Sequence, residues 1–304
     1  MAIATDQAIN PRRLLLLGAS SQIGVFAISR LIEAGFHVIA VSRKAKPEEF
    51  PAYDQVEWLD EAESVKASEN CQYLLSAGPI QLAQKFLATG EQFQSAVVFS
   101  SSSVETKRES DNTVEREQTR EILALESELR LGAPARGLKL VIFRPTLIYG
   151  CGLDTNISQL AKWIRRYGFM PVNGKATGLR QPVHADDLAS VAVTALLSEV
   201  VCPDAMSLTG GDTLSYSEMV SRIFTALGKP VRLLRLPQWL FVLLVNLASR
   251  FKTISGINGE MVKRQKLDLV FDDQLARELF NYDPRSFQPV SGDFSLPKLL
   301  ASKG

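Results

Sequence analysis

The sequence predicts an α/β fold, a doubly wound parallel sheet followed by a smaller, mostly helical C-terminal lobe. Short apolar segments alternate with amphipathic segments through the first half of the chain, which is typical of a parallel sheet covered by helices on both faces. The first apolar segment runs into a glycine-containing turn and then a helix. After Tyr149 the alternation loosens, and the longer segments have mainly helical periodicity.

The first unit is β-turn-α-β within about 30 residues, the size of a mononucleotide-binding unit. Residues 14–17 are apolar and predict a buried strand. Residues 22–34 place apolar side chains at helical spacing, and Gly35 is expected to end that helix. Residues 36–41 predict the second strand. Further strands are expected at 56–59, 72–76, 96–99, 138–143 and 206–208, with helices at 80–89, 116–131, 157–167, 186–198 and 214–228.

The turn Gly18-Ala-Ser-Ser-Gln-Ile-Gly24 joins the first strand to the first helix. Free backbone N–H groups and the helix dipole at such a point suit a pyrophosphate. Gly18 permits the tight turn, and Gly24 allows the helix to pack on the strand. Ser21 stands where a third glycine is usual, and its hydroxyl, like that of Ser20, can donate to phosphate. The turn therefore predicts a Rossmann-type dinucleotide-binding loop, with a sharp turn without ligand as the alternative.

The chain is expected to divide at about Tyr149. Residues 1–11 predict a flexible tail, 12–150 a dinucleotide-binding domain and 151–304 a substrate lobe, with 186–208 returning to the first domain.

The second strand is followed by Ser42-Arg43-Lys44, and the next acidic residue is Glu48. An NAD-specific site usually has an acidic residue here for the ribose 2′-hydroxyl. Arg43, with Lys44 beside it, matches a 2′-phosphate instead. The sequence therefore favours NADP over NAD, and a solvated basic pair is the alternative.

Composition limits the partners of the chain. Its formal net charge is +1, so no overall field attracts nucleic acid or an anionic membrane. Three cysteines and two histidines form no zinc pattern, so we expect no metal, and free thiols in a reducing compartment. The first residues show no secretory signal, which predicts a cytoplasmic protein.

Residues 237–248 form the most apolar segment of the chain. The segment covers about half of the ~20 residues that a membrane span requires, so no transmembrane helix is expected. It predicts a buried or interface helix, with shallow membrane contact or a dimer face as alternatives.

Five stretches together resemble the extended, atypical short-chain dehydrogenase/reductase superfamily, in its NAD-dependent epimerase/dehydratase-like group. They are GASSQIG (18–24), VVFSSSSV (97–104), FRPTLIYG (143–150), LRQPVHADDLA (179–189) and LTGGDTLSYSEMV (208–220). The resemblance implies a Rossmann domain with a C-terminal substrate lobe. It also implies an NADP-dependent oxidoreductase or a nucleotide-sugar epimerase/dehydratase.

The resemblance further implies roles by position. Ser101 matches the catalytic serine, with Ser102 as the alternative. Arg180 would bind a substrate diphosphate, and His184 belongs to the same substrate-binding segment. Asp60 would lie near the adenine, and Pro145 and Leu147 near the nicotinamide. The full set of cofactor-binding positions is Gly18, Ser20, Ser21, Gln22, Ile23, Gly24, Ser42, Arg43, Asp60, Ala77, Gly78, Pro145 and Leu147.

The tyrosine and lysine that do the family's proton transfer are missing. Residues 113–126 contain neither. If Glu126 matches the family's helix glutamate, Gln118 and Ile122 fill the two positions. A positioned acid/base group contributes about 10²–10⁴-fold, so rapid turnover needs a substitute. The candidates are Tyr149, Glu105, Lys107 and His184.

Two functions remain open. The first is a diverged enzyme acting on a small molecule such as a nucleotide sugar, and the sequence leans toward it. The second is a non-catalytic dinucleotide-binding redox sensor or assembly protein, which the missing pair favours. Pairing into a homodimer is left open.

Overall fold

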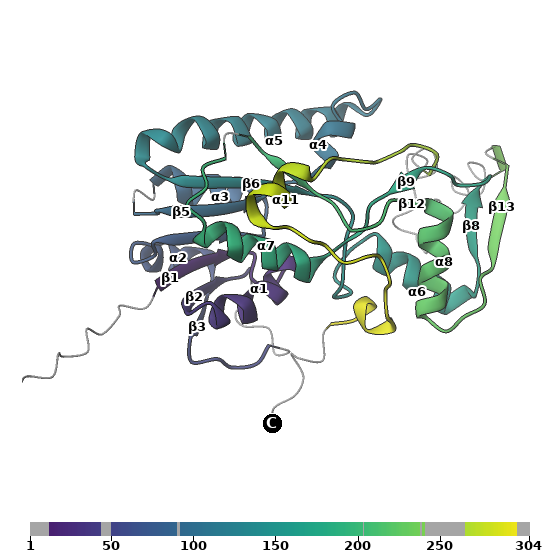
Figure 1. Cartoon of the computed structure of the whole chain (residues 1–304), viewed down its shortest axis with the longest axis horizontal. Helices are drawn as coiled ribbons and strands as arrows, with labels where there is room; N and C mark the ends of the chain where they lie inside the picture. Colours follow the sequence, from purple (N-terminus) through teal and green to yellow (C-terminus); the bar gives the residue numbers. More distant parts are fainter. Residues whose placement is uncertain are drawn as a thin grey trace, which may run out of the picture.

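The computed structural model of the protein describes residues 12–43, 50–89, 92–202, 204–237, 239–240 and 265–296. Within them the main sheet has seven strands in the order β11-β6-β5-β4-β1-β2-β3, and all neighbouring strands are parallel (Figure 1). The predicted Rossmann-type α/β fold is confirmed. The strands are β1 (Arg12–Leu17), β2 (Phe36–Val41), β3 (Val56–Leu59), β4 (Tyr73–Ser76), β5 (Ser95–Phe99), β6 (Lys139–Pro145) and β11 (Met206–Leu208).

The central strand β1 shows why both faces of the sheet are covered. Successive side chains of a strand point to opposite faces. Leu14 and Leu16 join the core under helices α1 and α7, whereas Leu15 and Leu17 join the core under α3 and α5. All four leucines are fully buried. The helices that cover the sheet are α1 (Gln22–Glu33), α2 (Glu61–Ser68), α3 (Ile80–Thr89), α5 (Thr113–Gly132) and α7 (Ala185–Leu197).

The smaller lobe has its own apolar core between α6 (Ile157–Tyr167) and α8 (Tyr216–Ala226). It also contains three two-stranded sheets in the described part of the chain. Each of these sheets pairs segments that are distant in sequence. The lobe therefore contains short strands, which the sequence did not indicate, between its helices. The pairs are β7 (Ile148–Tyr149) with β10 (Val183–His184), β9 (Leu179–Arg180) with β12 (Leu214–Ser215), and β8 (Met170–Asn173) with β13 (Leu233–Leu236).

Two sequence predictions for this region were wrong in detail. Residues 206–208 are not the last strand, because β12 and β13 follow. The helix expected at 214–228 begins at Tyr216, since Ser215 caps it by accepting a hydrogen bond from the Glu218 N–H at 3.1 Å. The preceding Leu214 pairs with Arg180 in β12. Strands of two residues are too short to show an alternating pattern.

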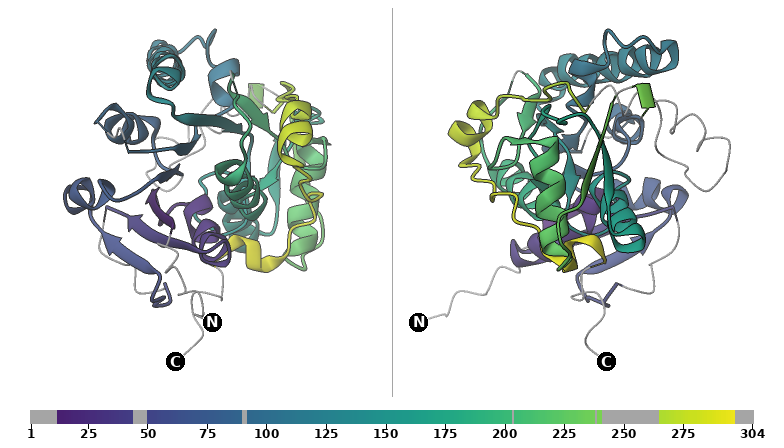
Figure 2. Two further views of the ribbon diagram at one scale, coloured as in Figure 1. Left: turned by 60° about the vertical axis from the view of Figure 1, so that its left-hand side comes forward. Right: turned by 90° about the vertical axis from the view of Figure 1, so that its right-hand side faces the viewer.

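The C-terminal part returns to the main sheet, as the yellow segment in Figures 1 and 2 shows. Helix α11 (Gln274–Phe280) packs on β11 and α7, and the 3₁₀ turn η2 (Ser291–Phe294) packs on α6. β11 lies beside β6 in the main sheet, and α7 packs on α1. The division into domains at residues 150 and 186–208 stays a prediction, and the tail at 1–11 lies outside the described residues.

A cluster of charges joins α1, α7 and this returning segment. Asp186 accepts hydrogen bonds from Arg30 at 2.7 Å and from Arg285 at 2.8 Å, and Arg285 also pairs with Asp187. Burial by itself raises the pKa of the Asp186 carboxyl, but the two arginines outweigh burial and hold this pKa below its usual value of 3.8. The cluster therefore stabilises the folded chain through the ionised form of Asp186.

We expect Asp186→Asn to lower the free energy of unfolding by about 1.5–3 kcal/mol at pH 7, because asparagine lacks the negative charge and offers the two arginines one acceptor oxygen instead of two. The pKa of Asp186 is lower in the folded than in the unfolded chain, so this contribution is complete well above pH 3.8 and is lost as the pH falls through the folded-state pKa. Urea unfolding of both proteins at neutral and acid pH measures it. An equal difference at every pH would contradict the assignment.

None of the helices in the described part of the chain combines the length and the apolarity needed to cross a membrane. The apolar stretch 237–248 lies mostly outside the described residues. The three cysteines are buried and form no disulfide. Burial raises the pKa of the Cys71 and Cys151 thiols to about 11, so both stay protonated at neutral pH.

Candidate functional site

The loop between β1 and α1 is built closely around its glycines. Gly18 has a φ of +71°, and a Cβ there would lie 2.7 Å from the Gly78 nitrogen. A Cβ on Gly24 would lie 2.4 Å from the Gly18 oxygen. Ser21 caps α1 by accepting a hydrogen bond from the Gly24 N–H at 3.2 Å. A hydroxyl that accepts a bond keeps its own proton to donate, so Ser21 can cap the helix and still bind a phosphate.

A cavity of about 970 Å³ opens beside this loop at the carboxyl ends of β1, β2, β3 and β4. Ligands of open α/β sheets bind at this edge. The Ser20 and Ser42 hydroxyls lie 2.9 Å apart and join the loop to the end of β2. The cavity brings together most of the predicted cofactor-binding residues, namely Gly18, Ser20, Ser21, Ser42, Arg43, Asp60, Ala77 and Gly78.

Charged groups of both signs line this cavity. Arg43 is exposed at the end of β2. The Asp60 carboxylate caps α2 by accepting from the Glu63 N–H at 2.9 Å. Lys85 and Glu61 form an ion pair of 2.6 Å. With the glycine cradle and the helix N-terminus, this wall fits the adenosine and pyrophosphate parts of a dinucleotide.

A second cavity of about 420 Å³ begins on the other side of the loop. Ser21 lines the first cavity, and the next residue, Gln22, lines the second. The Gln22 side-chain oxygen is buried and has no hydrogen-bond partner among the described residues, so it is available to a ligand. Predicted residues that line this cavity are Gln22, Ser101, Ser102, Leu147 and Arg180. Ile23, Gly24 and Pro145 are buried beside the cavities rather than lining them.

Ser101 lies in the turn between β5 and the short helix α4 (Ser103–Thr106). Its hydroxyl accepts from the Ser103 N–H at 3.2 Å and lies 2.9 Å from the Ser103 hydroxyl. The backbone N–H of Ser102 donates to the Pro145 carbonyl at 3.2 Å. These contacts fix the turn on β6 and align two hydroxyls along the cavity wall.

Lys107 lines the same cavity directly after α4. Its ammonium lies 3.3 Å from a Glu115 carboxylate oxygen, and the other oxygen of Glu115 accepts from the Ser110 hydroxyl at 2.8 Å. Glu105 lies in α4 and pairs with Arg144 at 3.1 Å instead. Of the titratable side chains lining this cavity in the described residues, Lys107 and Arg180, only a lysine exchanges protons readily.

Arg180 contributes a fixed positive charge. Its side chain is buried, and its Nη1 donates to the carbonyls of Leu179 at 2.6 Å and Leu267 at 2.7 Å. The guanidinium also lies 5.8 Å from the ring centre of Tyr216. These contacts hold the charge against the cavity.

Sequence reasoning did not predict the wall formed by residues 267–271. Leu267, Leu269 and Phe271 line the cavity. The Gln181 side chain pairs with the Phe271 backbone, accepting from its N–H at 2.8 Å and donating to its carbonyl at 3.3 Å. This pairing spans about ninety residues of chain, and no local pattern in the sequence indicates it.

The sequence assigns Gln118 and Ile122 to the positions of the expected tyrosine and lysine, and neither side chain can carry a proton. Gln118 is exposed on α5, and Ile122 packs into the apolar core. The aligned glutamate, Glu126, is buried and pairs with Arg144 on β6 through two hydrogen bonds, one of 3.2 Å from Nε and one from Nη2.

Tyr149 and His184 lie together between the lobes, and neither lines the two cavities. Their rings meet edge to face at 5.0 Å. His184 caps α7 through Nδ1, which accepts from the Asp186 N–H at 3.1 Å, and Nε2 lies 3.6 Å from Asp293. Burial raises the pKa of Tyr149, which opposes a role as a base. Substrate binding by His184 stays a prediction.

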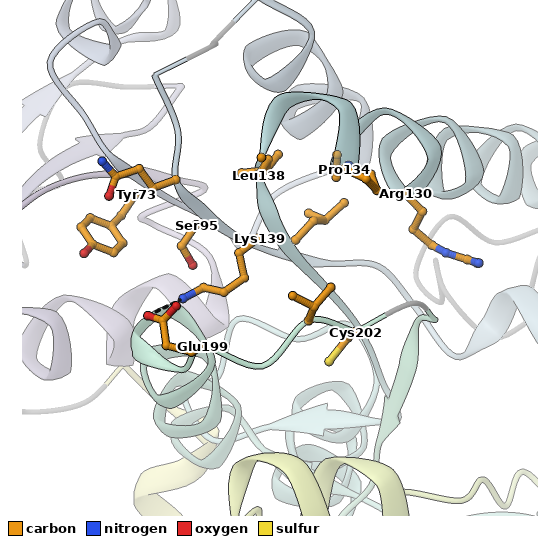
Figure 3. Close-up of a pocket in the computed structure, with 13 residues that line it drawn as sticks. Tyr73, Ser95, Arg130, Pro134, Leu138, Lys139, Glu199 and Cys202 are labelled. Carbon is orange, nitrogen blue, oxygen red and sulfur yellow. Dashed lines mark ion pairs between the residues drawn. The ribbon is translucent and has the colours of Figure 1, made fainter.

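A third cavity, of about 660 Å³, lies at the opposite edge of the sheet (Figure 3). Tyr73, Ser95 and Lys139 begin β4, β5 and β6 there, and Lys139 pairs with Glu199 at 3.5 Å. None of the predicted site residues lines it. The amino ends of the strands lack the helix N-termini of the other edge, so a dinucleotide is expected only at the first two cavities.

Comparison with known proteins gives one curated relative and many similar folds. No family model matches the chain. UDP-glucose 4-epimerase of Vibrio cholerae is 26% identical over 138 residues, which are 45% of this chain and 42% of that protein. The alignment therefore spans less than half of the relative.

The similar solved structures cover nearly the whole chain. Epimerase Mth375 from Methanothermobacter thermautotrophicus has a TM-score of 0.69 at 16% identity, covering 92% of this chain and 90% of its own. UDP-glucuronic acid 4-epimerase from Bacillus cereus, solved with UDP-glucuronic acid and NAD, has a TM-score of 0.67 at 14% identity, covering 95% and 99%. The chain therefore shares the Rossmann-type fold of these epimerases over nearly its whole length.

Proposed function

We propose that the protein is an NAD(P)-dependent oxidoreductase or nucleotide-sugar epimerase/dehydratase-like enzyme in which Lys107 replaces the missing tyrosine and lysine. One observation carries the proposal. The loop that suits a pyrophosphate separates a cavity fit for a dinucleotide from one lined by Ser101, Lys107 and Arg180. If the substrate is an alcohol that carries a phosphate group, the hydroxyl and the proton carrier can act on its alcohol oxygen. The fixed cation can bind the phosphate.

A bound nicotinamide would accept or supply a hydride at the carbon of the reacting substrate. The protein's own residues handle the oxygen of that carbon. Ser101, whose hydroxyl is oriented by Ser103, donates a hydrogen bond to this oxygen. Lys107, in its neutral amine form, takes the proton when the hydroxyl becomes a carbonyl, and the ammonium so formed, beside the Glu115 carboxylate, returns it in the reverse direction. Gln22, through its buried side-chain oxygen, accepts from a donor on the bound dinucleotide or substrate.

Arg180 suits the diphosphate of a nucleotide sugar. A guanidinium binds phosphate through two parallel hydrogen bonds, and Arg180 lines the same cavity as the Ser101 turn. The apolar wall formed by Leu267, Leu269 and Phe271 suits the face of a base or a sugar ring. The relatives solved with UDP-sugars point to the same class of substrate.

We also propose that the cofactor is NADP rather than NAD. Arg43 lines the first cavity where a 2′-phosphate would lie, and a charged hydrogen bond to phosphate contributes about 1.5–3 kcal/mol. Arg43→Ala is therefore expected to weaken NADPH binding by roughly 10–100-fold and to leave NADH binding almost unchanged. Fluorescence titration with both nucleotides measures this. If Arg43→Ala weakens the binding of NADPH and NADH equally, or weakens only the binding of NADH, Arg43 does not bind the 2′-phosphate.

The activity is tested with purified full-length protein. NADPH and NADH binding are titrated first, and NADPH-dependent conversion of ketones and UDP-sugars is then followed. Binding with turnover supports the enzyme. Tight binding without turnover of any substrate favours a non-catalytic redox sensor or assembly protein, which the missing pair also suits. Absence of binding to either nucleotide defeats both functions.

A further inference from the structure

The small lobe carries a charge distribution that the balanced net charge conceals. The whole chain has 34 lysines and arginines against 33 aspartates and glutamates. Residues 156–176 and 226–237 nevertheless contain no acidic residue at all. The first range forms α6 and β8, and the second runs from the end of α8 through β13, which pairs with β8. Their basic residues are Lys162, Arg165, Arg166, Lys175, Lys229, Arg232 and Arg235.

Three aromatic side chains lie among these charges at the end of α6. Trp163 is half-buried against the core of the small lobe, its ring is tilted by 45° to that of Tyr167 with ring centres 4.3 Å apart, and its indole N–H donates to the Phe169 carbonyl at 2.9 Å. Tyr167 and Phe169 are 40% and 36% exposed. Large aromatic rings with open faces are unusual on a surface that contacts only water.

The basic groups surround this aromatic cluster. The Arg166 guanidinium lies 5.3 Å from the centre of the Tyr167 ring. The Lys229 ammonium donates to the Arg165 carbonyl at 3.0 Å, and the N–H of Met170 donates to the Arg232 carbonyl at 2.9 Å, so both chain segments meet at the turn after α6. We call this surface the basic–aromatic patch. It consists of Lys162, Trp163, Arg166, Tyr167, Phe169, Lys229 and Arg232.

The neighbouring acidic groups do not neutralise the patch. Asp154 is buried at the other end of α6, where it accepts from the Ser158 N–H at 2.8 Å. Asp212 and Glu218 pair with Arg222 on α8. The patch residues belong to α6, the turn after it and the segment that leads into β13, and the small lobe that contains these elements faces the viewer in the right-hand view of Figure 2.

We propose that the basic–aromatic patch docks the protein on the surface of an anionic lipid bilayer. Tryptophan, tyrosine and phenylalanine settle at the level of lipid head groups, and nearby lysines and arginines are attracted to anionic lipids. Trp239, a few residues after β13, is another exposed aromatic side chain, at 69% exposure. Aromatic rings and cations on one surface are typical of interfacial binding rather than of a membrane span.

The same surface fits other partners less well. Nucleic acids stack their bases within grooves, and none of the patch residues lines the cavities described above. A second copy of the chain would set the patch against itself in a two-fold interface, and the cations would repel each other.

The test uses full-length protein sedimented with two kinds of vesicle, phosphatidylcholine alone and phosphatidylcholine mixed with phosphatidylglycerol. We expect binding to the mixed vesicles only, weakened by high salt. Lys162→Glu with Arg166→Glu is expected to lower binding at least about 25-fold, since each basic residue near an anionic surface contributes about fivefold. Tyr167→Ser with Phe169→Ser should weaken binding while leaving the net charge unchanged.

The matched control is Lys66→Glu with Arg120→Glu, which changes the net charge equally at exposed residues of α2 and α5. Circular dichroism shows that each variant is folded. An equal loss of binding in patch and control variants would overturn the proposal. So would absence of binding to mixed vesicles, tighter binding of a single-stranded RNA that the patch variant abolishes, or a patch-dependent dimer in light scattering.

Discussion

Replacing Lys107 by methionine is expected to lower the rate of NADPH-dependent turnover by about 10²–10⁴-fold, the contribution of a positioned acid/base group. Methionine keeps the length of the side chain and removes the proton carrier. Lys107 lines the cavity that contains the Ser101 turn, and Gln118 and Ile122, which the sequence comparison through Glu126 assigns to the tyrosine and lysine positions, carry no proton. The affinity for NADPH should change much less than the rate, because Lys107 does not line the cavity that suits the adenosine and pyrophosphate parts of the dinucleotide.

Two further variants separate the roles that Lys107 can play. Lys107→Arg keeps the positive charge but exchanges protons poorly, so it restores turnover only if the charge alone is needed. Lys66→Met, on the exposed face of α2, controls for the loss of a lysine elsewhere. Unchanged turnover in Lys107→Met would show that another group carries the proton. A parallel loss in Ser101→Ala would place both groups on the same reacting oxygen.

The sequence predicted best where one strand or one turn decides the structure. Strand β1 was recognisable because Leu14 to Leu17 are buried on both faces and leave an uninterrupted apolar run. Most of the predicted cofactor residues meet in one cavity because the carboxyl ends of parallel strands share an edge of the sheet. Both features follow from local pattern and general topology alone.

The sequence could not show which side chains face the second cavity. Glu105 and Lys107 are two residues apart, yet Glu105 pairs with Arg144 and Lys107 lines the cavity. The short helix α4 directs these two side chains to different partners. Its four residues are too few to show a helical period in the sequence. The wall at 267–271 depends on pairing of Gln181 with Phe271, which is a contact between distant segments.

The largest effect on stability is expected from Glu126→Ala, which should lower the free energy of unfolding by about 3–5 kcal/mol, as breaking a buried ion pair does. The Glu126 side chain is 2% exposed, and that of its partner Arg144 is 16% exposed. Removing the carboxylate leaves the Arg144 guanidinium beside the sheet, with Glu105 on α4 as its ion-pair partner at 3.1 Å. Urea unfolding followed by circular dichroism measures the loss.

Glu105→Ala is the matched control for this ion pair. The Glu105 side chain is 43% exposed, so its pair with Arg144 should contribute only about 0–1 kcal/mol. Replacing both Glu126 and Arg144 by leucine should recover much of the lost stability, because no charge then stays buried. If the double variant is as unstable as Glu126→Ala, the cost comes from the space that the side chains fill, and the charge of Glu126 is not what joins α5 to the sheet.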